Sequence, residues 1–204
     1  MELKSHCRER FEPAVDAIRQ LLEEKKGSDE PLLAAIDGRC GSGKTTLGEY
    51  LKQVFDCNLF RMDDFFLRME QRTPERLREV GGNVDYERFE ETVLRPLLQK
   101  EQVCYQPFSC QEWRLLKAYP IPYKKLNIIE GSYSMHPYFK NPYHVRIFMN
   151  ISPEDQIANI KKRNGLEKAK QFQNIWIPKE EAYFEKFHVM EGAIQIMWNL
   201  KTEE

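Results

Sequence analysis

The sequence lacks any long hydrophobic run. Its most apolar segments, residues 32–36 and 145–151, are far shorter than the roughly 20 residues that a membrane-spanning helix needs. Residues 1–4, Met-Glu-Leu-Lys, do not open a secretory signal. We therefore expect a soluble, cytoplasmic protein that has no membrane partner.

An excess of charge of one sign is also missing, because 31 Lys and Arg residues balance 32 Asp and Glu residues. This balance argues against a protein that binds nucleic acid through bulk positive charge. The five cysteines are an odd number and contain no C-x-x-C pair. Disulfide frameworks and zinc sites are therefore not expected, and free thiols fit a reducing compartment.

What the sequence does contain is an alternation of strand-like and helix-like segments. Residues 32–36 form a wholly apolar run between turn residues, which is typical of a strand buried on both faces. Further strands are predicted at 57–62, 126–129 and 145–151, and helices at 11–26, 47–55 and 86–98. This order predicts one α/β domain over residues 1–204, with a mainly parallel sheet that helices cover on both faces. In such sheets, ligands bind at the carboxyl ends of the strands.

A glycine-rich loop follows the first predicted strand. Residues 38–45, Gly-Arg-Cys-Gly-Ser-Gly-Lys-Thr, match the pattern G-x-x-x-x-G-K-[ST] at every required position. Glycines let successive N–H groups point at phosphate oxygens, and the helix that follows adds its positive end. In this pattern Lys44 would meet the β- and γ-phosphates and the Thr45 hydroxyl would bind Mg²⁺. The predicted ATP-binding residues are Gly38, Arg39, Cys40, Gly41, Ser42, Gly43, Lys44, Thr45 and Thr46.

Acidic residues follow two of the other predicted strands. Asp63 and Asp64 come directly after residues 59–62, and Glu130 follows Ile129. Beside a phosphate loop, one acid can orient and deprotonate an attacking hydroxyl while another holds Mg²⁺. The alternative for Asp63 and Asp64 is that they cap the following turn. The chain has no N-K-x-D sequence and no L-S-G-G-Q-type signature, so neither a GTPase nor a transporter ATPase is favoured.

Four segments together resemble the uridine kinase and phosphoribulokinase group of P-loop kinases. They are residues 38–46, Asp63-Asp64-Phe65-Phe66, Asn83-Val84-Asp85-Tyr86 and Ile129-Glu130-Gly131-Ser132-Tyr133. The resemblance implies the three-layer P-loop NTPase fold and transfer of the γ-phosphoryl of ATP to a hydroxyl of a small molecule, first of all a nucleoside such as uridine. Nicotinamide riboside, pantothenate or a sugar phosphate are alternative acceptors. A non-catalytic ATP-binding regulatory protein is the alternative from another class, and a homo-oligomer is left open.

The resemblance also implies roles for single residues. Asp63 matches the acid that takes the proton from the acceptor hydroxyl, and it groups with Thr45 and Glu130 around Mg²⁺. Asp85 matches an acid that binds ribose hydroxyls, although a cap for the helix beginning at Tyr86 is an equal alternative.

The lid and the acceptor pocket are the remaining expectations. Residues 160–178 match the lid of related kinases, where a cation meets the transferring phosphoryl group. Arg163 is the best candidate because Arg can bind phosphate through two hydrogen bonds, and the alternative is a solvated helix face. The acceptor pocket is expected from residues 64–125, in which the Tyr105 ring would either stack on the acceptor or pack in the core. Residues 1–27 would form an N-terminal helix.

Overall fold

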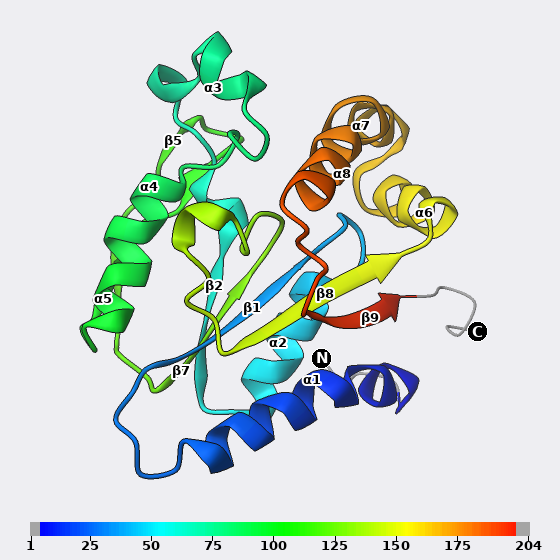
Figure 1. Ribbon diagram of the computed structural model, residues 1–204. Coiled ribbons are helices and arrows are strands. Elements are labelled where there is room, and N and C mark those ends of the chain that lie inside the picture. The colour runs from blue at the N-terminus through cyan, green and yellow to red at the C-terminus, as the bar shows by residue number, and fades with distance from the viewer. Residues whose placement is uncertain (1–4, 199–204) are drawn as a thin grey trace.

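The computed structural model describes residues 5–198, which are built around one parallel sheet (Figure 1). The sheet has the strand order β2-β7-β1-β8-β9, and all four neighbouring pairs are parallel. Its strands are β1 (Leu32–Gly38), β2 (Cys57–Arg61), β7 (Leu126–Glu130), β8 (Val145–Ile151) and β9 (Ile194–Trp198). The predicted parallel sheet is confirmed, and β1 lies at its centre.

Burial explains why these segments are strands. Every residue of β1 and of β7 is buried, which is the pattern expected of central strands that are covered on both faces. The edge strand β9 instead alternates between buried and exposed side chains along its second half. β9 was not predicted, because its only signal in the sequence is this short alternation.

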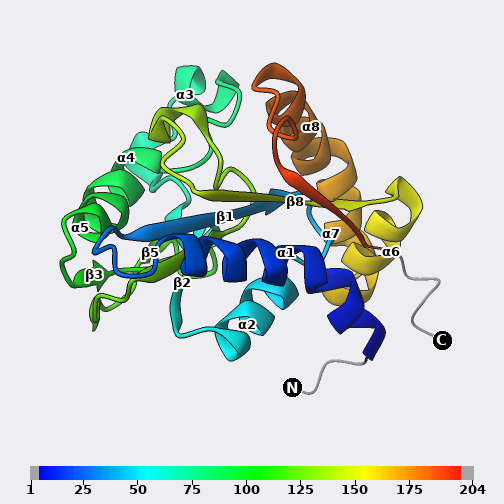
Figure 2. The ribbon, with the colours of Figure 1, turned by 60° about the horizontal axis from the view of Figure 1, so that its bottom comes forward.

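Helices cover both faces of the sheet, as Figures 1 and 2 show. On one face, Phe11 and Ile18 of the first helix and Leu47 and Leu51 of the second join one core cluster with the strands. The other face of the sheet packs against a separate core, which includes Phe89 and Phe184. The helices are α1 (Ser5–Glu24), α2 (Lys44–Val54), α3 (Pro74–Arg78), α4 (Tyr86–Phe89), α5 (Arg95–Leu98), α6 (Pro153–Asn164), α7 (Leu166–Gln171) and α8 (Ile177–Lys186).

The predicted helix at 86–98 is formed by α4, a π-helical turn and α5 in direct succession. The π-helical turn, Glu90–Leu94, immediately precedes a helical turn that contains Pro96. Proline has no N–H to continue the ordinary hydrogen-bond ladder, so a wider turn at this point has a local cause.

Two groups of short elements stand above the carboxyl ends of the strands. One lies beyond β2 and contains α3 and the hairpin of residues 108–115, and the other contains α6, α7 and α8 (Figure 1). The hairpin strands are β3 (Val103–Tyr105) with β6 (Tyr119–Ile121), and β4 (Phe108–Ser109) with β5 (Arg114–Leu115). Among residues 5–198, no helix is both long and apolar enough to cross a membrane.

Candidate active site

The glycine-rich loop connects β1 to α2 at the centre of the sheet. Gly38 has a φ of 132°, and a Cβ atom there would lie 2.1 Å from the carbonyl oxygen of Met149, so only glycine fits this position. The loop ends at Lys44, where α2 begins and where the N–H groups of its first turn have no partner within the helix. The Lys44 ammonium lies over the loop and donates to the carbonyl oxygens of Gly38 (2.6 Å) and Arg39 (3.0 Å).

Acidic side chains gather next to the loop because β7 and β2 end beside it. Glu130, the last residue of β7, is paired in register with Arg61, the last residue of β2. The Glu130 carboxylate accepts a hydrogen bond from the Thr45 hydroxyl at 3.2 Å. Burial, and next the negative charge of Asp63, raise the pKa of Glu130 to about 7.

The two adjacent aspartates point to different places. Asp63 is exposed and lines the central cavity. The Asp64 carboxylate instead accepts a hydrogen bond from the Tyr105 hydroxyl at 2.6 Å, and burial raises its pKa. The structure therefore brings Asp63, and not Asp64, to the cavity with Thr45 and Glu130.

The donor set around Thr45 fits a magnesium ion. It consists of one hydroxyl and two carboxylates, all hard oxygen ligands of the kind that Mg²⁺ prefers. Glu130 is buried, and burial together with the nearby charge of Asp63 raises its pKa. A divalent cation would offset both effects. Within residues 5–198 no three His, Cys, Asp or Glu side chains form a metal cluster. A magnesium ion here would therefore also need the Thr45 hydroxyl and substrate phosphates as ligands.

A cavity of about 840 Å³ opens above the loop. Lys44, Thr45, Asp63 and Glu130 all line it. The region of α6 and α7 closes another side with the side chains of Lys162, Arg163 and Lys168. Arg163 is exposed, and its only hydrogen bond among the described residues is to the neighbouring Asn164 side chain at 2.8 Å. The predicted lid cation thus reaches the cavity with its charge unpaired.

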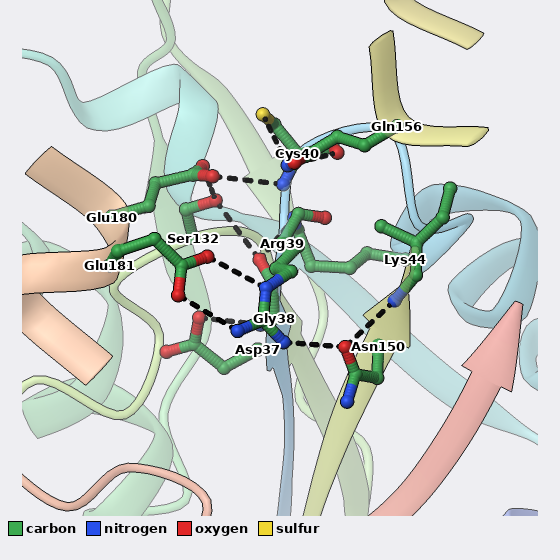
Figure 3. A network of polar contacts seen from close by, with 11 residues as sticks. Asp37, Gly38, Arg39, Cys40, Lys44, Ser132, Asn150, Gln156, Glu180 and Glu181 are labelled. Carbon is green, nitrogen blue, oxygen red and sulfur yellow. Dashed lines mark hydrogen bonds and ion pairs between the residues drawn. The ribbon is translucent and has the colours of Figure 1, made fainter. Parts of the chain in front are cut away.

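The first half of the loop is bound to α8 through two consecutive glutamates (Figure 3). The Arg39 guanidinium donates to both carboxylate oxygens of Glu181, at 2.7 and 2.8 Å. The Cys40 N–H donates to Glu180 Oε2 at 2.9 Å, and the Ser132 hydroxyl donates to Glu180 Oε1 at 2.5 Å. Arg39 therefore holds α8 against the loop, whereas Glu180 lines the cavity itself.

Cys40 has no sign of a reactive thiol. Burial and the negative charge of Glu180 raise the pKa of this thiol well above its usual range, and only the thiolate form is an effective nucleophile. Its side chain packs with Ile160 and Ala169 of the neighbouring helices.

Two predicted substrate-binding residues do not reach the cavity. Asp85 is buried, caps α4 through the N–H of Arg88 at 3.2 Å, and pairs with the Arg88 side chain at 3.3 Å. The helix-cap interpretation of Asp85 is confirmed. Tyr105 is also buried, and its ring packs against Phe60 and Phe65. The Asp85 carboxylate is bound to Arg88, and the Tyr105 hydroxyl is bound to Asp64, so both polar groups have partners within the protein.

Other residues that line the cavity were not predicted as site residues, among them Arg72, Asn83, Ser132 and Glu180. Ser132 and Asn83 belong to segments that carried the resemblance, but nothing in their spacing marked them individually. Glu180 is not marked by any local pattern in the sequence. Its role depends on contacts with residues about 140 positions away.

No family model matches the sequence, and no curated protein matches it. Solved structures do match along almost the whole chain. One, described as a possible uridine kinase from Bacillus stearothermophilus, is 18% identical, with 94% of this chain and 99% of the other covered and a TM-score of 0.68. Another, provisionally described as a fructose transport system kinase from Silicibacter sp. TM1040, is 19% identical, with 93% and 98% covered and a TM-score of 0.69.

A D-glycerate 3-kinase from Cryptococcus neoformans var. grubii serotype A is 15% identical, with 84% of this chain and 87% of the other covered and a TM-score of 0.60. At identities this low, the structural match establishes a common fold only. The chemistry has to be argued from the residues of the site. The chain thus has the α/β P-loop NTPase fold, and its resemblance to the uridine kinase and phosphoribulokinase group is confirmed at the level of fold.

Proposed function

We propose that this protein is an ATP-dependent phosphotransferase that moves the γ-phosphoryl group to a hydroxyl of a small molecule. The observation that carries the proposal is the convergence of Lys44, Thr45, Asp63 and Glu130 on one cavity beside the phosphate loop. These are the groups that phosphoryl transfer needs: a phosphate cradle, oxygen ligands for a metal, and an acid beside the acceptor. Kinases among the solved structures with the same fold support the same class.

Each residue has a role that follows from its position. The loop amides and Lys44 would hold the phosphates of ATP, and Thr45, Asp63 and Glu130 would hold Mg²⁺. The ion would neutralise negative charge on the terminal phosphates. Asp63 is exposed to the cavity, so it can accept the proton of an acceptor hydroxyl, and Arg163 can balance the charge of the transferring group.

The next question is which small molecule accepts the phosphoryl group. The resemblance favours a nucleoside such as uridine, and aromatic side chains in the cavity, including Phe66, Phe108 and Trp113, could stack on a base. Against a nucleoside, Asp85 and Tyr105, the two residues expected to recognise it, do not line the cavity. The proposal is therefore the kinase reaction, with uridine as one acceptor to test.

The proposal is tested by measuring ADP release from ATP over a panel of small hydroxyl compounds, with ATP binding measured separately by calorimetry. We expect ATP binding, Mg²⁺-dependent ADP release, and one acceptor that raises the rate well above the background hydrolysis. ATP binding without stimulated release by any acceptor would favour the non-catalytic regulatory alternative.

A further inference from the structure

Arg72 lines the cavity and differs from the arginines near it in the sequence, because it forms no ion pair among the described residues. Residues 61–88 contain six arginines: Arg61, Arg68, Arg72, Arg76, Arg78 and Arg88. Five of them form ion pairs with carboxylates. Among the residues that the structure describes, Arg72 alone of the six has no carboxylate within ion-pair distance, although it lines the cavity.

Arg72 is held in place by an aromatic ring instead. Its guanidinium lies 5.3 Å from the centre of the Trp113 ring, and Trp113 packs against Phe108 of β4. A ring face attracts a cation but does not use its hydrogen-bond donors. The five N–H donors of Arg72 therefore remain available at the cavity, in a fork that suits carboxylate or phosphate oxygens.

A second cation lies near Arg72. The Lys179 ammonium of α8 donates to the carbonyl oxygen of Leu77 at 3.3 Å and forms no ion pair with any described carboxylate. Burial and the positive charge of Arg72 lower the pKa of Lys179. Two cations that repel each other without a counter-charge favour the binding of an anion between or beside them.

Asn83 adds an independent sign of a missing ligand. Its side chain is 97% buried and lines the same cavity, and the Tyr133 hydroxyl lies beside it. Among the described residues, however, neither its amide oxygen nor its amide nitrogen has a hydrogen-bond partner in good geometry. Buried polar groups are nearly always paired, because leaving one unpaired costs about 1–3 kcal/mol. An acceptor with hydroxyl or acid groups would supply the partners.

The reacting acid and the unpaired cation lie within reach of one small molecule. Burial raises the pKa of the Cys110 thiol, the negative charge of Asp63 raises it further, and Arg72 acts in the opposite direction. Cys110 thus lies within electrostatic range of both Asp63 and Arg72. All three line the same cavity.

We propose that the phosphate acceptor is an anion, and that Arg72 binds its carboxylate or phosphate group while Asp63 faces its hydroxyl. This inference rests on the proposed kinase function and narrows it to one chemical class of acceptor. Of the acceptors left open above, pantothenate and sugar phosphates carry such a group, whereas uridine and nicotinamide riboside do not.

The test compares acceptors that carry a carboxylate or phosphate group with counterparts that lack this group. ADP release is measured with pantothenate against panthenol, ribose 5-phosphate against ribose, and uridine and nicotinamide riboside as uncharged and cationic nucleosides. The variants are Arg72→Gln, Arg72→Lys and, as the matched control, Arg78→Gln. Arg78 lies on α3, its side chain is 74% exposed, and it pairs with Glu75, whose side chain is 73% exposed.

We expect an anionic acceptor to be preferred over its neutral counterpart. Arg72→Gln should raise the KM for that acceptor about 10- to 100-fold, the range for a lost charge-assisted hydrogen bond, and leave the KM for ATP within about twofold. Arg72→Lys should fall between wild type and Arg72→Gln, and Arg78→Gln should behave as wild type. The matched pair that shows the preference identifies the group that Arg72 binds. The pantothenate pair would indicate a carboxylate, and the ribose 5-phosphate pair would indicate a phosphate.

Several results would overturn the proposal. Preference for a neutral nucleoside that Arg72→Gln leaves unchanged would do so while the kinase function stands. A raised KM for ATP with an unchanged KM for the acceptor would place Arg72 on the nucleotide instead. If no acceptor stimulates ADP release, the kinase function fails, and calorimetry with the anionic compounds decides the anion site. Binding that Arg72→Gln abolishes would support that site, and absence of binding would overturn it.

Discussion

The backbone N–H of Cys40 in the phosphate loop donates to a carboxylate oxygen of Glu180 on α8, at a distance of 2.9 Å. The other oxygen of Glu180 accepts from the Ser132 hydroxyl. A buried negative charge therefore lies directly against the loop that is expected to hold the phosphates of ATP. Glu180 fastens the loop to α8, and at the same time it opposes the binding of further negative charge.

Replacing Glu180 by Gln tests this double role. Loss of the charge should strengthen ATP binding by about 3- to 10-fold, since repulsion between nearby like charges is worth about 1 kcal/mol under partly screened conditions. Weaker hydrogen bonds to Cys40 and Ser132 should lower the free energy of unfolding by about 1 kcal/mol. Calorimetry with ATP and denaturant unfolding measure the two effects. Glu185→Gln, exposed on the same helix, is the control, and unchanged or weaker ATP binding in Glu180→Gln would contradict the repulsion.

Asp63 and Asp64 offer a matched pair of variants. Asp63→Asn should leave ATP binding nearly intact and lower turnover by about 10²-fold or more, the usual effect of removing a positioned acid or base. Asp64→Asn should keep turnover within a few fold, because Asp64 is bound to Tyr105 and does not line the cavity. Steady-state ADP release and ATP calorimetry on both variants make the comparison. Wild-type turnover in Asp63→Asn would remove the assigned role.

Glu130 is predicted to set the requirement for magnesium. Glu130→Gln removes one of the two carboxylates beside Thr45, so the Mg²⁺ concentration for half-maximal ADP release should rise by about tenfold. Chelation of Mg²⁺ should abolish release in the wild type. Glu49→Gln is the control, because Glu49 shares Arg61 with Glu130 but does not line the main cavity. An unchanged Mg²⁺ dependence in Glu130→Gln would place the metal elsewhere.

His136 should make the fold sensitive to acid. Its ring lies between Tyr86 and Tyr183, its Nδ1 accepts from the N–H of Tyr138 at 3.2 Å, and burial lowers its pKa to about 4. Between pH 6.5 and about 4 the unfolded chain binds a proton that the folded protein excludes, so stability contributed by neutral His136 falls as the pH falls. At about 1.4 kcal/mol per pH unit, the loss reaches about 3 kcal/mol by pH 4.

Unfolding of wild type and of His136→Asn across this pH range tests that expectation. Asn can keep the bond to the Tyr138 N–H without titrating near neutral pH, so the difference in stability between the two proteins should shrink as the pH falls. His188→Gln, which changes an exposed histidine, should retain the wild-type slope. A parallel pH dependence in wild type and His136→Asn would contradict the prediction.

Much of the fold could be predicted because its signals are local. The apolar runs of β1, β2, β7 and β8 and the stripe of α1 each lie within one continuous segment, so hydrophobic burial alone specifies them. The edge strand β9 was missed because only one of its faces is buried and the segment is short. The phosphate loop could be predicted for the same reason, because its strand, glycines, Lys44 and helix follow one another directly in the sequence.

The site beyond the loop was less predictable because its side chains choose partners from distant segments. Asp63, Asp64 and Asp85 are equivalent as carboxylates in the sequence, yet only Asp63 lines the cavity. The Tyr105 hydroxyl donates to Asp64, and the Arg88 side chain pairs with Asp85. Neither pairing could be predicted from the residues next to it in the sequence.

By itself, the sequence determined that the chain forms a parallel α/β sheet with a phosphate loop at its centre, because that loop's chemistry belongs to eight consecutive residues. Tertiary structure alone decided what surrounds the loop. It decided which acid faces the cavity, that Glu180 meets Cys40 from about 140 residues away, and that Arg72 has no carboxylate partner within residues 5–198. Its near-neutral net charge conceals this arrangement, because charges that cancel in the composition become separated across one cavity when the chain folds. The physical reason is that charge pairing and burial depend on distances in space, which composition and spacing along the chain do not specify.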